Sequence, residues 1–174
     1  GTFGTVLVIA GSNSMRGAAA FAVLGALRSG AGLVKAASVS KCIDTISVLA
    51  PEATYVEIEN DSNGFMVFND NTREKLREQL KKSTAVVIGS GMGVTDDTKE
   101  IVRFVIENSF CPVIIDADGI NCIASDIELL VNRKSEVILT PHPGEMGRLL
   151  NCDADAINEN RIMVAEKYAE KPAG

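Results

Sequence analysis

The sequence predicts an α/β domain of three layers, with a mainly parallel sheet between two layers of helices. The strand-like segments are continuous apolar runs, which is typical of strands buried on both faces. These runs alternate with amphipathic segments of roughly ten residues, the pattern of right-handed βαβ units. A chain of 174 residues is long enough for one domain with a sizeable core.

Three strands and two helices are expected in the first half of the chain. The opening strand is an aliphatic run that ends at a polar loop bounded by glycines, residues 11–17. The alanine-rich segment after this loop favours a helix, and Gly30 and Gly32 terminate it. The expected elements are a strand at 5–10, a helix at 18–28, a strand at 33–37, a helix at 43–49 and a strand at 54–58.

The second half continues the alternation after a polar stretch at 60–71. That stretch is the most loop-like part of the chain, and we expect it to be mobile. A charged helical pattern with a capping residue follows, and then further aliphatic runs. The expected elements are a helix at 72–82, a strand at 85–88, a helix at 96–107, strands at 112–116 and 136–139, and a closing helix at 153–170.

Composition excludes several function classes. The net charge of −6 repels duplex nucleic acid, and the lack of Trp, with only two Tyr, argues against stacking platforms for single strands. No apolar stretch approaches the roughly 18–20 residues of a membrane span. We therefore expect neither a nucleic-acid partner nor a membrane anchor.

The cysteines argue against a metal centre. They form no C-x-x-C pair, and a single histidine rules out a two-histidine site. Scattered cysteines beside apolar residues are typical of small core residues in a reducing compartment, so we expect a cytoplasmic protein with no zinc site and no metal-ligating side chains among these residues. The four are Cys42, Cys111, Cys122 and Cys152.

The one histidine, His142, lies between two prolines at the end of the last predicted strand. Pro141 and Pro143 push the residues before them toward extended geometry, and Pro143 suits the first position of a helix. Glu145 then falls in the first helical turn, where the helix dipole favours a carboxylate. A lone histidine is usually structural or exposed. Its place at a strand's carboxyl end favours a ligand contact, as a hydrogen-bond donor or a stacking surface.

Three loops that follow strands are expected at the same edge of the sheet. The small residues around 11–17 let a ligand approach the next helix, although a tight turn explains them equally well. The loop at 89–93 has neither dinucleotide-fingerprint spacing nor a phosphate-loop lysine, yet its glycines let a ligand touch the backbone. In the third loop, Asp116 and Asp118 could bind a metal, orient a base or cap a helix.

Several segments form an ordered set of motifs along nearly the whole chain. The most specific is Thr-Pro-His-Pro-Gly-Glu at 140–145. The other segments are Gly-Thr-Phe-Gly at 1–4, then 6–11, 15–19, 26–32, Pro-Glu-Ala at 51–53, 88–93 and 112–121. Together they resemble the NAD(P)H-hydrate dehydratase family, and the ensemble is a stronger signal than any one motif.

The resemblance implies a ribokinase-like fold and the repair of hydrated NADH or NADPH. It implies that ADP or ATP, with Mg²⁺, drives dehydration through phosphoryl transfer to the ring hydroxyl and subsequent elimination. Matching the family's motifs residue by residue implies that Ala18 (or Ala19), Gly91 and His142 contact the hydrated cofactor. Asp116 and Asn121 match family positions near the site.

The chain departs from the family's pattern after Glu145. The family carries a later lysine-glycine pair and a glycine-rich loop ending in Gly-Asp, whose aspartate is the expected catalytic base, and neither is found here. We therefore expect residues 1–174 to form one ribokinase-like domain that lacks the C-terminal nucleotide-binding part and is inactive alone. An unpaired sheet edge would then need cover from a further C-terminal segment or from a second copy in a homo-oligomer.

Two other functions stay open at this point. One is a kinase of the same fold for a sugar, a hydroxymethylpyrimidine or a thiazole alcohol, because fold does not decide function. The other is a nucleotide-binding module without catalysis. A dinucleotide-dependent oxidoreductase fits least, because its glycine spacing and ribose-binding acid are missing.

Overall fold

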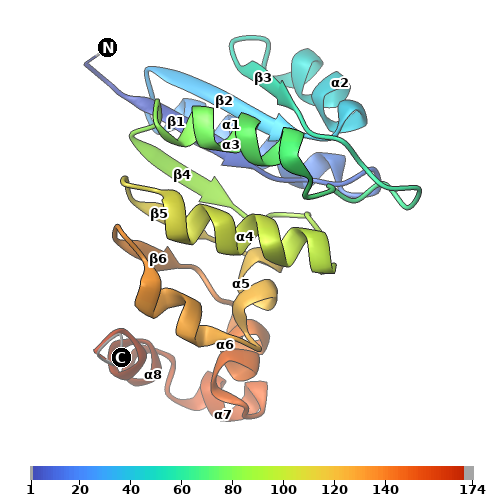
Figure 1. Cartoon of the computed structure of the whole chain (residues 1–174). Helices are drawn as coiled ribbons and strands as arrows, with labels where there is room; N and C mark the ends of the chain where they lie inside the picture. Colours follow the sequence, from blue (N-terminus) through green and yellow to red (C-terminus); the bar gives the residue numbers. More distant parts are fainter. Residues whose placement is uncertain (1, 171–174) are drawn as a thin grey trace.

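The computed structural model describes residues 2–170 and shows a six-stranded parallel sheet between helices (Figure 1). The expected three-layer α/β class is confirmed. The strands are β1 (Thr5–Ile9), β2 (Leu33–Ser38), β3 (Thr54–Glu57), β4 (Ala85–Ile88), β5 (Val113–Ile115) and β6 (Val137–Leu139). The helices are α1 (Arg16–Arg28), α2 (Ser40–Leu49), α3 (Asp70–Leu80), α4 (Asp96–Asn108), α5 (Asp118–Ile123), the 3-10 helix η1 (Ile127–Asn132), α6 (Pro143–Leu150), α7 (Ala154–Glu159) and α8 (Arg161–Ala169).

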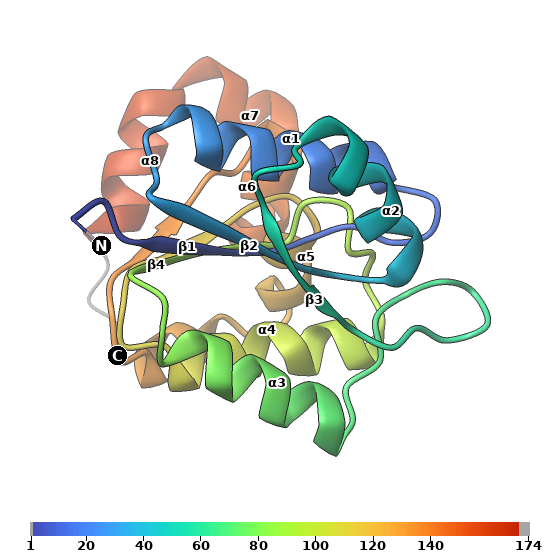
Figure 2. The same ribbon diagram turned by 90° about the horizontal axis from the view of Figure 1, so that it is seen from above.

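The strand order is β3-β2-β1-β4-β5-β6, and every neighbouring pair is parallel. After β1, the strands β2 and β3 are added on one side of it. β4 then pairs with the other side of β1, and β5 and β6 extend the sheet in that direction. Right-handed crossovers in opposite directions put α1 and α2 on one face and α3 and α4 on the other (Figure 2). Open sheets bind ligands where the order reverses, which here is between β1 and β4.

The central strands are buried on both faces, which explains their uninterrupted aliphatic runs. In β1, Leu7 and Ile9 on one face are 0% exposed and Val8 on the other is 1% exposed, and in β2 the adjacent Ala36 and Ala37, on opposite faces, are 1% and 0% exposed. The outermost strand differs: Ile138 of β6 is 52% exposed, and β6 pairs only with β5 among the described strands. The sheet therefore has an accessible edge at β6.

The C-terminal part differs from the sequence prediction. The expected closing helix at 153–170 is wrong as one helix, because α7 and α8 are separate and Asn160, with φ −143° and ψ 44°, stands between them. Asparagine side chains compete with helical hydrogen bonds, which favours such breaks. The sequence analysis also missed α5 and η1. Each has six residues, too few for a helical period to show.

The polar segment that precedes α3, residues 60–69, folds back toward the loop after β1. The Oδ1 of Asp61 accepts hydrogen bonds from the backbone N–H groups of Asn63 and Phe65, both at 2.9 Å. The carbonyl of Gly64 accepts from the N–H of Asn13 at 2.9 Å, which ties this segment to the loop after β1. Its mobility stays a prediction.

We expect the free cysteines to differ sharply in reactivity. Cys42 and Cys122 are buried, and burial raises the pKa of both thiols, whereas Cys152 is exposed. N-ethylmaleimide should therefore modify Cys152 in the native protein within minutes, and Cys42 and Cys122 only after unfolding. Timed labelling followed by peptide mass spectrometry measures this. Equal rates at Cys152 and Cys122 would contradict the packing described above.

Within residues 2–170, none of the helices combines the length and the apolar character that a membrane crossing requires.

Candidate functional site

The loops after β1 and β4 meet at the reversal point of the sheet. The N–H of Gly11 donates to the carbonyl of Ser90 at 2.8 Å, and the N–H of Gly89 donates to the carbonyl of Ile9 at 3.1 Å. Two of the three loops predicted to carry chemistry are therefore held together by backbone hydrogen bonds. They lie where an α/β sheet of this order binds its ligands.

Gly91 lies against the start of α1. Its φ is +70°, and a Cβ placed on it would be 2.8 Å from the Cβ atoms of Ala18 and Met15. Only glycine fits this combination of left-handed backbone and close approach. The structure thus brings together two of the residues expected to contact a ligand, Ala18 and Gly91.

Ala19 is placed differently from its neighbour. It is 1% exposed, and a Cβ placed on Gly11 would be 2.8 Å from its own Cβ. Ala19 packs under the β1 loop, in the core, while Ala18 is half-buried beside Gly91. Of these two alternatives, the geometry favours Ala18 as the residue that faces a ligand.

His142 is the N-cap of α6. Its Nδ1 accepts from the backbone N–H groups of Gly144 at 3.0 Å and Glu145 at 3.4 Å. An accepting Nδ1 carries no proton, so the ring proton is on Nε2, which lies 3.0 Å from Oε1 of Glu145. Nδ1 is therefore engaged within the helix start, and Nε2 lies beside the Glu145 carboxylate. The side chain is still 62% exposed, so it offers a rigidly held ring face.

The buried carboxylate of Glu145 also contacts His142. Its side chain is 6% exposed, and its Oε2 accepts from the backbone N–H of His142 at 2.9 Å. The expected place of Glu145 in the first turn of a helix that begins at Pro143 is confirmed. The sequence analysis missed that this carboxylate is buried, accepts from the backbone of His142 and lies beside its ring. The spacing of three residues between cap and carboxylate is the signal that could have shown it.

Asp116 joins the loops after β4, β5 and β6. Its Oδ2 accepts from Oγ of Ser90 at 2.8 Å, and its Oδ1 accepts from Oγ1 of Thr140 at 2.7 Å. The sequence analysis included Ser90 and Thr140 in its motifs but predicted no role for either side chain. Their signal was available, because both are hydroxyl residues within two positions of a strand's carboxyl end.

Asp118 and Asn121 hold α5 to its neighbours. The Oδ2 of Asp118 accepts from the backbone N–H of Gly93 at 2.9 Å, so this carboxylate anchors the glycine loop. The Oδ1 of Asn121 accepts from Nη1 of Arg148 at 3.0 Å, which links α5 to α6.

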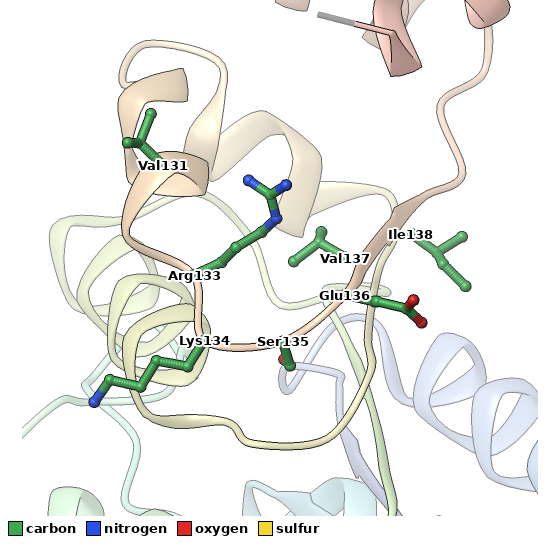
Figure 3. A pocket seen from close by; sticks show the side chains of 7 residues that line it. All are labelled: Val131, Arg133, Lys134, Ser135, Glu136, Val137 and Ile138. Carbon is green, nitrogen blue, oxygen red and sulfur yellow. The ribbon is translucent and has the colours of Figure 1, made fainter. Parts of the chain in front are cut away.

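A cavity of about 710 Å³ lies elsewhere, on the amino-terminal side of β6. Its lining comes from one continuous stretch of chain, and the side chains point in different directions (Figure 3). A ligand site normally has a few polar groups that converge on one point. We therefore do not take this cavity as the functional site. It is lined by Val131, Arg133, Lys134, Ser135, Glu136, Val137 and Ile138.

A metal site is not apparent in residues 2–170, where no three His, Cys, Asp or Glu side chains are placed to share an ion. The described residues do not fit a Mg²⁺ ion by themselves, so we derive no step through one.

Comparison with known proteins finds relatives that match nearly the whole length of this chain. The model of a family described as NAD(P)H-hydrate dehydratase matches residues 6–174. An ADP-dependent (S)-NAD(P)H-hydrate dehydratase from Bacillus subtilis is 34% identical over 170 residues, which is 97% of this chain and 55% of that protein. The chain spans between 32% and 55% of the length of the first curated relatives it matches.

Solved structures agree on the fold. The crystal structure of an ADP/ATP-dependent NAD(P)H-hydrate dehydratase from Bacillus subtilis, crystallised with ATP and Mg²⁺, superposes with a TM-score of 0.71 at 30% identity. The superposition covers 97% of this chain and 55% of that one. A ribokinase-like protein from Enterococcus faecalis superposes with a TM-score of 0.68 at 22% identity, over 91% of this chain and 53% of that one. The expected ribokinase-like fold is confirmed.

Proposed function

The chain belongs to the NAD(P)H-hydrate dehydratase family, and from that premise we propose that the protein dehydrates hydrated NADH or NADPH with ADP or ATP as co-substrate. The observation that carries the proposal is the contact of Gly91 with Ala18 at the β1–β4 reversal point. Only small residues meet at this contact, a buried glycine and a half-buried alanine, at the place where the fold binds ligands. We infer that the nicotinamide nucleotide approaches the backbone beside them.

The proposed chemistry makes a poor leaving group into a good one. The hydrated cofactor carries a hydroxyl on its reduced ring, and phosphoryl transfer from the nucleotide converts that hydroxyl into a phosphate ester. The C–O bond then breaks as the ring nitrogen donates its lone pair. Loss of a ring proton restores the reduced nicotinamide.

This chain's own residues are proposed to bind and orient the hydrated cofactor. Ala18 and Gly91 give the nucleotide access to the backbone, and the exposed ring face of His142 packs against it. Nδ1 of His142 is already bonded to its own helix and Nε2 lies 3.0 Å from Oε1 of Glu145, so a stacking contact suits the ring better than a new hydrogen bond. Asp116 and Asn121 are proposed to lie near the site rather than in it. We assign no catalytic base within residues 1–174.

The test is the recovery of the absorbance of reduced NADPH after addition of nucleotide and Mg²⁺ to the full-length protein and hydrated NADPH. We expect recovery with ADP or ATP and none without a nucleotide. The 174-residue chain alone should show none, because it has no Gly-Asp loop. Phosphorylation of a sugar, hydroxymethylpyrimidine or thiazole alcohol, with no effect on the hydrate, would instead support the kinase alternative.

We also propose a cytoplasmic location and a covered β6 edge. The four cysteines are all free, which fits a reducing compartment. The exposed edge of β6 fits cover by further chain or by a second copy of the protein. Sedimentation of the full-length protein distinguishes these two kinds of cover.

A further inference from the structure

We propose that Asp116 is a positioning residue that sets the Gly91 loop and the His142 loop at a fixed separation. This inference rests on the proposed function, because it concerns the two loops assigned to the hydrated cofactor. The carboxylate lies on the loop after β5, between β4 and β6 in the sheet. It therefore stands midway between the two loops.

Each oxygen of Asp116 holds one of these loops. Oδ2 accepts from Ser90, the residue next to Gly91, at 2.8 Å. Oδ1 accepts from Thr140, two residues before His142, at 2.7 Å. A planar carboxylate with one hydroxyl on each oxygen fixes the distance between those hydroxyls, and thus between the two loops.

The backbone beside Asp116 is strained, and neighbouring glycines accommodate it. Ala117 has φ 50° and ψ −117°, a conformation that L-residues rarely adopt. A Cβ placed on Gly89 would lie 2.0 Å from the carbonyl oxygen of Asp116, and that carbonyl accepts from the N–H of Gly119 at 2.9 Å. The surrounding structure therefore holds the turn that aims the carboxylate at both hydroxyls.

The role we assign depends on hydrogen-bond geometry and not on charge. Among residues 2–170, no ion pair joins Asp116 to a cationic side chain. The Oγ1 of Thr140 also lies 3.4 Å from the carbonyl of Ile115, so its proton has a second acceptor. An asparagine at 116 could then accept from Ser90 and donate to Thr140. Asp116→Asn should keep the two loops in place, while Asp116→Ala should release them.

The experiment compares these two variants in the full-length protein. A third variant, Thr140→Val, is milder because it removes only one of the two hydrogen bonds to Asp116. Asp44→Ala, which removes an exposed carboxylate of α2, is the matched control. For Asp116→Ala we expect KM for hydrated NADPH to rise about tenfold, because two hydrogen bonds are lost. For Asp116→Asn the rise should stay within about threefold, with kcat little changed. Thr140→Val should fall between the two.

A second readout does not depend on activity. Hydrogen–deuterium exchange of peptides covering 89–95 and 139–146 should be at least about fivefold faster in Asp116→Ala and near wild type in Asp116→Asn. Equal losses of activity in both variants, with unchanged exchange, would show that the charge of Asp116 matters and would overturn the inference. If the wild type does not convert the hydrate, the proposed function is wrong, and the exchange data alone decide the role of Asp116.

Discussion

Replacing Gly91 by valine should weaken ligand binding at the carboxyl-terminal edge of the sheet and destabilise the protein. A β-branched residue cannot easily adopt the φ of +70° found here, and its Cβ would lie 2.8 Å from those of Ala18 and Met15. Backbone strain and overpacking each cost about 1–3 kcal/mol, so we expect a loss of about 2–5 kcal/mol in the free energy of unfolding. The loop must also move away from α1, and the affinity for NADPH should fall at least about tenfold.

Urea unfolding and a fluorescence titration with NADPH measure the two effects separately. Gly25→Ala is the matched control, because Gly25 lies within α1, is exposed, and has no atom within 4 Å of a Cβ placed on it. This control should stabilise the protein by about 0.5–1 kcal/mol and leave the affinity unchanged. A folded Gly91→Val protein with wild-type affinity would show that the ligand does not approach this loop.

Replacing His142 by alanine should both destabilise the protein and weaken ligand binding. The N-cap of α6 is lost, and the buried carboxylate of Glu145 keeps only the backbone N–H of residue 142 as a partner. Loss of a cap costs about 0.5–2 kcal/mol, and an undersatisfied buried acceptor costs about 1–3 kcal/mol. We expect a total of about 2–4 kcal/mol, seen as a lower Tm.

Asparagine at position 142 separates these two roles. It is a strong N-cap, so His142→Asn should recover most of the lost stability in a thermal melt. Asparagine has no aromatic ring, so the affinity of the His142→Asn protein for NADPH should stay as low as that of the His142→Ala protein. Recovery of both properties would mean that His142 is only a cap, and the stacking contact proposed above would be wrong.

The loop contacts explain why the site was only partly predictable. The residues expected at the site were chosen by their motifs, and most of them follow strands whose carboxyl ends meet at one edge. A motif does not show which of two adjacent alanines faces outward. The packing of Ala19 against Gly11, eight residues earlier in the chain, settles that orientation, and the two meet only because α1 folds back over the loop after β1. The contacts that hold His142 were predictable from local spacing, because the capping residue His142 and the carboxylate of Glu145 are three residues apart.

The sequence by itself determined the fold class, the parallel sheet and the place of His142 at a strand's end before a helix. These depend on local properties: aliphatic runs long enough to be buried, breaks at glycine, and the restraint that proline puts on its neighbours. It could not show the short helices α5 and η1, or the break at Asn160, because six-residue helices depend on their neighbours for stability.

Only the tertiary structure decided the strand order and what that order brings together. The return of the chain from β3 to β4 places Gly91 against Ala18, and the order β4-β5-β6 puts Asp116 between Ser90 and Thr140. These contacts join residues 24 to 73 positions apart in the chain. Local preferences do not encode such pairs, since they form only when the buried strands have settled into one sheet.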